Sequence, residues 1–247
     1  MDDFLLFVVV GFVAQMVDGS IGMAYGLTGT SVLISLGTPP AVASASIHAA
    51  EVFTTGASGL SHWRLGNVDG RLLARLAVPG AVGGLAGALT AAWMPAEVIR
   101  PAVSLYLLGM GGLILWRALR PYVQSEPPRH VAPLGLAGGF LDAAGGGGWG
   151  PLVTSTLIGQ GRVPRIAIGS TNAAEFFVTI TITLAFFAAI GVELWLVILG
   201  LVVGGVVAAP FAALATRKLP DRPLMLIVGV VVMLLSARSL LIALGWA

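Results

Sequence analysis

Apolar runs recur along the whole chain, and each has about the length of a membrane-spanning helix. A helix needs roughly 20 apolar residues to cross the hydrocarbon core of a bilayer. The longest connection between these runs and the two Gly-rich segments described below is 117–131, which is far shorter than the ~50 residues of a small soluble domain. Only 10% of the residues are charged. We therefore predict an all-α integral membrane protein. The runs are 4–17, 41–60, 72–93, 101–116, 166–190, 194–215 and 224–244.

Several function classes are excluded by what the chain lacks. Without cysteine it has no disulfide, no thiolate metal site and no thiol catalysis. It has no Walker-type phosphate loop, so ATP hydrolysis is not supported. The net charge is only +2, and the arginines lie at the ends of apolar runs, which argues against nucleic-acid binding. The spacing offers no nucleophile–base pair and no metal cluster, so we expect no enzyme, catalytic residue, cofactor or metal.

The chain contains an internal repeat. At an offset of 124, residues 11–55 align with 135–179 without a gap, and 17 of the 45 pairs are identical. The identical pairs include carboxylates, prolines and glycines, which chance similarity between apolar stretches would not favour. We predict a first repeat at 1–117, a cytoplasmic linker at 118–131 and a second repeat at 132–247. Asp18 and Asp142 are equivalent in this repeat, which explains the pair better than an intramembrane aspartic protease does.

The positive-inside rule gives the repeats opposite orientations. Residues 4–36 are too many for one span and contain a Gly-rich break, so we expect either a re-entrant pair of half-helices or two short crossings, followed by three spans. Ten of the thirteen basic residues then fall on one face, in the connections 62–71, 117–131, 159–165 and 216–222. We predict inverted repeats in a cell inner membrane, with both termini periplasmic.

The two Gly-rich breaks, 18–26 and 142–150, are the first candidate site. A half-helix that begins just after each Gly cluster would present free N–H groups and a positive dipole end to an anion, and glycine would let the ligand approach. The alternative is that the glycines only permit close helix packing. We expect Asp18 and Asp142 to accept hydrogen bonds from the turns, whereas Tyr25 and Trp149 either line the pocket or pack.

Acidic residues in the middle of full spans are the second feature. Glu51 and Glu175 are repeat equivalents, and a carboxylate near the bilayer centre costs at least about 2.5 kcal/mol on insertion scales. Helical spacing places His48 beside Glu51 and Asn172 beside Glu175. Either each carboxyl clamps a Gly-rich turn, or these groups carry a coupled proton.

Three motifs in order resemble the sulfite exporter TauE/SafE family, also called the toluene-sulfonate uptake permease family. They are Pro40-Ala41-Val42-Ala43, Gly66-Asn67-Val68-Asp69 and Gly145-Gly146-Gly147-Gly148. The resemblance covers nearly the whole chain and implies a bacterial inner-membrane carrier for sulfite, sulfonates or related organosulfur anions. The first turn departs from the family pattern, because Met23 and Tyr25 stand where a glycine-dense run is typical.

We therefore expect a secondary transporter that binds a small anion between the two breaks near the membrane midplane, with protons as candidate partners. The alternative is an anion channel or uniporter whose pore the same turns line. The sequence leaves the substrate, the direction of transport and an oligomeric state open. Expected substrate-binding residues are Gly22, Tyr25, Gly26, Ser46, His48, Gly145, Gly146, Gly147, Gly148, Trp149, Ser170 and Asn172. Expected coupling or site-structuring residues are Asp18, Glu51, Asp142 and Glu175.

Overall fold

The chain is helical throughout the part that the computed structural model describes, which is residues 2–23, 25–120, 130–160, 162–191, 193–216 and 221–245. No strand occurs in these ranges. The first half contains α1 (Asp2–Ile21), α2 (Tyr25–Ser35), α3 (Pro40–Arg64), α4 (Gly70–Trp93) and α5 (Ala96–Ala118). The second half contains α6 (Val131–Gly145), the π-helical turn η1 (Trp149–Thr154), α7 (Ser155–Gly159), α8 (Pro164–Ile190), α9 (Trp195–Ala215) and α10 (Asp221–Ala243).

The helices have the length and composition of membrane spans, which confirms the predicted fold class. Within the described residues, five segments are long and apolar enough to cross a bilayer. They are Phe4–Ile21, Gly70–Trp93, Glu97–Ala118, Pro164–Ile190 and Trp195–Ala215. Most of the predicted linker at 118–131 lies outside the described residues, as do Arg129, Arg217 and Lys218.

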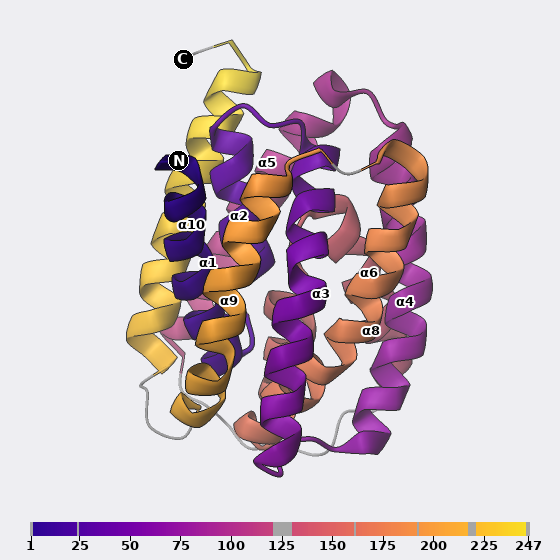
Figure 1. Cartoon of the computed structure of the whole chain (residues 1–247), viewed down its shortest axis with the longest axis vertical. Helices are drawn as coiled ribbons and strands as arrows, with labels where there is room; N and C mark the ends of the chain where they lie inside the picture. Colours follow the sequence, from indigo (N-terminus) through magenta and orange to yellow (C-terminus); the bar gives the residue numbers. More distant parts are fainter. Residues whose placement is uncertain are drawn as a thin grey trace.

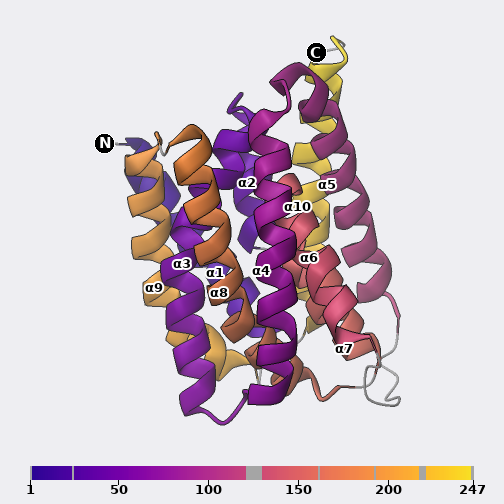
Figure 2. The ribbon, with the colours of Figure 1, turned by 90° about the vertical axis from the view of Figure 1, so that its right-hand side faces the viewer.

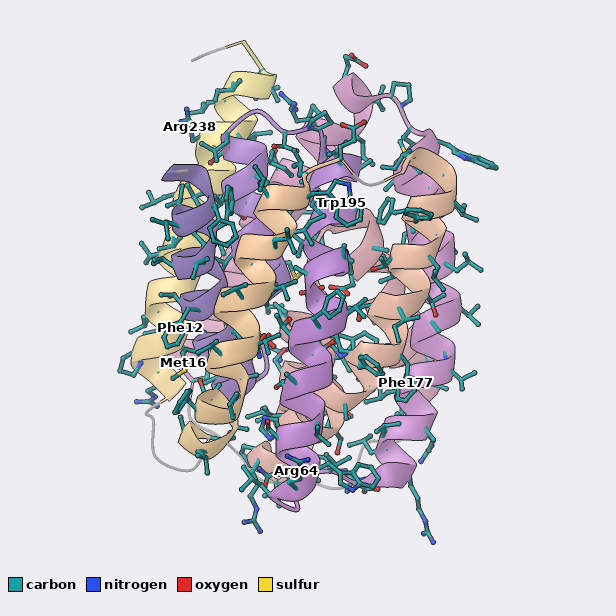
Figure 3. The ribbon with its side chains drawn as sticks, in the orientation of Figure 1. Phe12, Met16, Arg64, Phe177, Trp195 and Arg238 are labelled. Atoms are coloured by element: carbon teal, nitrogen blue, oxygen red, sulfur yellow. The ribbon has the colours of Figure 1, made fainter. Side chains whose placement is uncertain are left out.

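Both termini lie at one end of the bundle, and Arg64 lies at the opposite end (Figures 1 and 3). The equivalent helices α3 and α8 pack side by side and antiparallel, because Gly56 faces Phe176 and Gly59 faces Ala173. Helix α1 starts at the end that holds the termini, whereas α6 starts at the other end (Figures 1 and 2). These directions are those that inverted repeats would have, although the duplication itself stays a prediction.

The first helix of each half packs mainly on the other half. Helix α1 lies parallel to α9, and α6 lies parallel to α4. Glycines allow these close approaches, since a Cβ at Gly204 would overlap the carbonyl oxygen of Val8 and one at Gly83 would overlap that of Leu136. The two predicted repeats therefore interlock and share one core.

The breaks fall where the repeat places them. Helices α2 and η1 begin at Tyr25 and Trp149, which are equivalent residues. The 11 residues of α2 rise only about 16 Å, and α2 returns toward the end where α1 began (Figure 1). Helix α1 is longer than the half-helix we expected, because its 20 residues, about 30 Å, are enough to cross a bilayer.

The outer surface is apolar around the middle of the bundle. Phe12 on α1 and Phe177 on α8 are exposed there, and Trp195 on α9 is exposed nearer the end that holds the termini (Figure 3). Charged ends flank this band, with Arg64 at one end and Arg238 at the other. Such a surface suits contact with lipid, so the polar side chains of functional interest are those turned inward.

Candidate functional site

A polar stripe runs along the inner face of α3. Its residues are spaced four, three, four, three and four apart, which keeps them on one side of the helix. All of them are at most 1% exposed, and the stripe spans about 27 Å, close to the thickness of the hydrocarbon core. It consists of Ser44, His48, Glu51, Thr55, Ser58 and His62. The polar side chains of this stripe make α3 less apolar than the five segments named above, which is why α3 is not among them.

His48 lies in the N-terminal half of this stripe, and each of its ring nitrogens faces an acceptor oxygen. Nδ1 lies 2.8 Å from the carbonyl oxygen of Ser44, an atom that can only accept, so Nδ1 carries a proton. Nε2 lies 3.2 Å from Oδ2 of Asp142 and 3.7 Å from Oε2 of Glu51. The second nitrogen of His48 is thus directed at two carboxylates. The predicted neighbourhood of His48 and Glu51 is confirmed, and Asp142 joins it from the other half.

Asp142 closes the second break. Its Oδ1 accepts from the backbone N–H groups of Gly148, at 2.8 Å, and Trp149, at 3.0 Å. The equivalent Asp18 accepts from the backbone N–H of Tyr25. The expectation that these aspartates accept hydrogen bonds from the turns is confirmed. It follows that the N–H groups we assigned to an anion are at least partly occupied by fixed carboxylates.

The four consecutive glycines are tightly packed. A Cβ at Gly145 would overlap the ring of Tyr106, and one at Gly148 would overlap its hydroxyl. Gly146 has φ +69° and faces Thr30, whose hydroxyl donates to the Gly146 carbonyl. In this conformation the four glycines therefore permit close packing, which is the alternative to an anion site.

The two breaks touch each other through backbone atoms. Gly147 has φ +148°, a conformation open only to glycine, and its Cα would lie 2.9 Å from a Cβ at Gly26. A Cβ at Gly150 would overlap the backbone of Met23, and one at Gly22 would overlap Thr154. The predicted meeting of the two turns is present, but in this conformation backbone contact fills the place assigned to the anion.

The paired aromatic residues are built into the core. Tyr25 is 2% exposed and donates its hydroxyl to the carbonyl of Leu201 at 3.2 Å. Trp149 is fully buried and donates Nε1–H to the carbonyl of Thr171 at 3.2 Å. Each side chain therefore links a short helix to a long one through a hydrogen bond. Of the two expected roles, lining a pocket or packing, both residues have the packing role in this conformation.

The second half offers different chemistry at the position of His48. The side chain of Asn172 accepts from Ser58 at 2.8 Å and donates to the carbonyl of Ile168 at 3.2 Å. Glu175 is buried beside it and interacts electrostatically with Asp18. The centre of the bundle thus gathers four carboxylates, those of Asp18, Glu51, Asp142 and Glu175.

The two serines that we predicted to bind substrate, Ser46 and Ser170, form hydrogen bonds outside this cluster of carboxylates. The hydroxyl of Ser46 donates to Val42 on its own helix at 2.8 Å. The hydroxyl of Ser170 accepts from the backbone N–H of Asp69 at 2.9 Å and so holds the α3–α4 connection against α8. These bonds are structural and do not reach His48.

Sequence reasoning missed several residues that shape the centre. Ser44 and His62 extend the stripe of α3 and could have been found from its spacing. Tyr106, whose hydroxyl donates to the Gly147 carbonyl at 3.0 Å, left no such signal, because it comes from α5. Gln15 on α1 is fully buried, and neither polar atom of its side-chain amide has a hydrogen-bond partner within the part of the chain that the structure describes.

Comparison with known proteins gives one family. A family model described as sulfite exporter TauE/SafE matches residues 7–239. A Bacillus subtilis (strain 168) protein named probable membrane transporter protein YtnM is 41% identical over 251 residues, which cover 98% of this chain and 84% of that protein. No solved structure matches the chain.

Proposed function

We propose, from the premise that this chain belongs to the sulfite exporter TauE/SafE family, that it is a secondary transporter for a small anion of the sulfite, sulfonate or related organosulfur class. The family match agrees with the resemblance seen in the sequence. The protein is a membrane transporter and not an enzyme. Its substrate class, binding site and coupling ion are proposals.

The observation that carries the proposal is the contact between one helix break from each half, deep in the bundle. Irregular backbone at membrane depth is tolerated where protein or a water-filled cavity satisfies its polar groups. Here Gly26 and Gly147 touch in the closed arrangement. We infer that the anion enters when the breaks separate toward one side at a time, as in alternating access.

The charge of the centre favours coupling to a cation. Four buried carboxylates surround the region where the breaks meet, and His48 is the basic side chain in contact with two of them. An anion brought into this region without positive charge would meet a strongly unfavourable potential. We therefore propose that the anion moves together with a cation, and we take the proton as the coupling ion.

Purified protein in liposomes tests the proposal directly. Labelled sulfite uptake should saturate, should be accelerated by unlabelled sulfite on the opposite side, and should be competed by sulfonates more strongly than by simple carboxylates. An imposed pH gradient without a substrate gradient should drive net sulfite movement. Absence of sulfite flux under all these conditions would contradict the proposed substrate.

A channel or uniporter is the second candidate, because the same breaks could line a pore. Such a protein would show sulfite flux that does not saturate and is not accelerated by counter-substrate, and a pH gradient would not drive it. We further propose that the protein lies in the inner membrane with both termini on the periplasmic side.

A further inference from the structure

We propose that His48, Glu51 and Asp142 bind one divalent transition-metal ion of the zinc class in the middle of the bundle. One ligand atom from each of the three side chains lies within 4.8 Å of the other two. His48 and Glu51 belong to α3, and Asp142 lies near the end of α6. The ion would therefore hold the long helix of one half against the break of the other, a role beyond anion transport.

Each ligand side chain directs one atom at the place of the ion. His48 uses its Nδ1–H on the Ser44 carbonyl, and its Nε2 points into the cluster, where it hydrogen-bonds Oδ2 of Asp142 at 3.2 Å; the ion would take the place of the Nε2 proton between these two atoms. Metal-bound histidines are usually oriented by such a bond to their other nitrogen. Asp142 uses Oδ1 for the N–H groups of Gly148 and Trp149, so its Oδ2 faces His48.

Glu51 supplies an independent observation in favour of a cation. Its side chain is 1% exposed, and among the described residues Oε2 has no hydrogen-bond partner, although it lies 3.7 Å from Nε2 of His48. That distance is too long for a hydrogen bond. A buried carboxylate oxygen without a partner is costly, and a cation between the three groups would satisfy it.

Charge balance selects a divalent ion. With His48 neutral, the three side chains carry two negative charges, which one divalent cation neutralises. A single proton on Nε2 would leave one charge in the bilayer interior. A second proton on Glu51 would neutralise the charge but would not join the three side chains to one another, as a metal ion would. A divalent metal ion would therefore neutralise the two negative charges and coordinate Oε2 of Glu51.

The donor set favours the zinc class over the common hard cations. One imidazole nitrogen with two carboxylate oxygens suits Zn²⁺, Co²⁺ or Mn²⁺. Mg²⁺ and Ca²⁺ prefer oxygen ligands throughout. The equivalent position of the other half cannot repeat the site, because the amide of Asn172 is already bonded to Ser58 and Ile168.

Metal content of the full-length protein tests the inference. The protein is purified in detergent through a tag without histidines, stripped with chelator, and titrated with Zn²⁺ in the presence of excess Mg²⁺. We expect one Zn²⁺ per chain, and a visible absorption band when Co²⁺ replaces it. His48→Gln and Glu51→Gln should each weaken Zn²⁺ binding by more than ~100-fold, since loss of an outer-shell partner alone costs ~10–100-fold.

Two matched variants control for general damage to the buried stripe. His62→Gln removes another buried histidine of α3, whose nitrogens already bond Gly19 and Asn67. Glu175→Gln removes the equivalent acid of the other half. His62→Gln should keep wild-type Zn²⁺ affinity, and Glu175→Gln, which removes a nearby charge but no ligand atom, should lower it far less than Glu51→Gln does. Wild-type protein that binds no stoichiometric Zn²⁺, or controls that lose it equally, would overturn the site.

The two proposals fail separately. Zn²⁺ binding is measured in detergent without any flux, and sulfite flux is measured in liposomes prepared with chelator or with Zn²⁺. Bound Zn²⁺ without sulfite flux contradicts the transport proposal alone. Normal sulfite flux in a protein that never binds Zn²⁺ contradicts the metal site alone.

Discussion

Substituting Gly147 by alanine should strongly destabilise the protein, because two separate costs meet at this residue. Its φ of +148° is a conformation that L-residues rarely adopt, which costs about 1–3 kcal/mol. The added Cβ would also overlap backbone atoms of Leu27 and Gly26, and overpacking of this kind costs about 1–3 kcal/mol more. We expect Gly147→Ala to lower the free energy of unfolding by about 2–6 kcal/mol.

Two further glycines separate these costs. Gly37 has φ +95° and open space around its Cα, so Gly37→Ala should lose only the backbone part, about 1–3 kcal/mol. Gly109 lies inside α5 with open space, where alanine should stabilise by about 0.5–1 kcal/mol. Chemical unfolding of the three variants in detergent measures all three changes. If Gly147→Ala unfolds like Gly37→Ala, the two breaks are not in contact.

Three other measurements address the break, a helix end and the orientation. Tyr106→Phe removes the hydrogen bond to the Gly147 carbonyl and should cost about 1 kcal/mol in the same unfolding assay. Asp69→Ala removes the side chain that accepts from the first N–H groups of α4, which should cost about 0.5–2 kcal/mol, whereas Asp69→Asn should cost less. In intact cells, an impermeant thiol reagent should label a single cysteine placed at Asp2 and not one placed at Gly66; the reverse pattern would contradict the topology.

The sequence predicted features that depend on spacing along one helix or on the internal repeat. Helical spacing placed His48 beside Glu51, and the repeat placed the two breaks, within which the short helices begin at the equivalent residues Tyr25 and Trp149. The expectation that Asp142 accepts from its own turn is also met, because that contact spans only six or seven residues. Such local contacts follow from short-range geometry.

Contacts between the halves could not be predicted in the same way. Nothing in the spacing tells that Asp142 of the second half meets His48 of the first, or that Tyr106 covers Gly145 and Gly148. The glycines illustrate the difficulty, because a ligand and a neighbouring backbone require the same absence of a side chain. Only the packed structure distinguishes the two in this conformation.

The two halves share a backbone plan but differ in chemistry at one position, and this difference determines how the centre can move. His48 contacts Asp142 across the halves, whereas the equivalent Asn172 is bonded to Ser58 on the facing helix α3. Movement of the breaks apart must therefore either carry Asp142 along with α3 or leave His48 and Glu51 without their partner. The second course exposes buried charge in the bilayer, which is costly unless a cation or a proton stays with α3. Because Asn172 carries no charge, separation at its side breaks a neutral hydrogen bond to Ser58 and no charged pair, and the two directions of opening are energetically unequal.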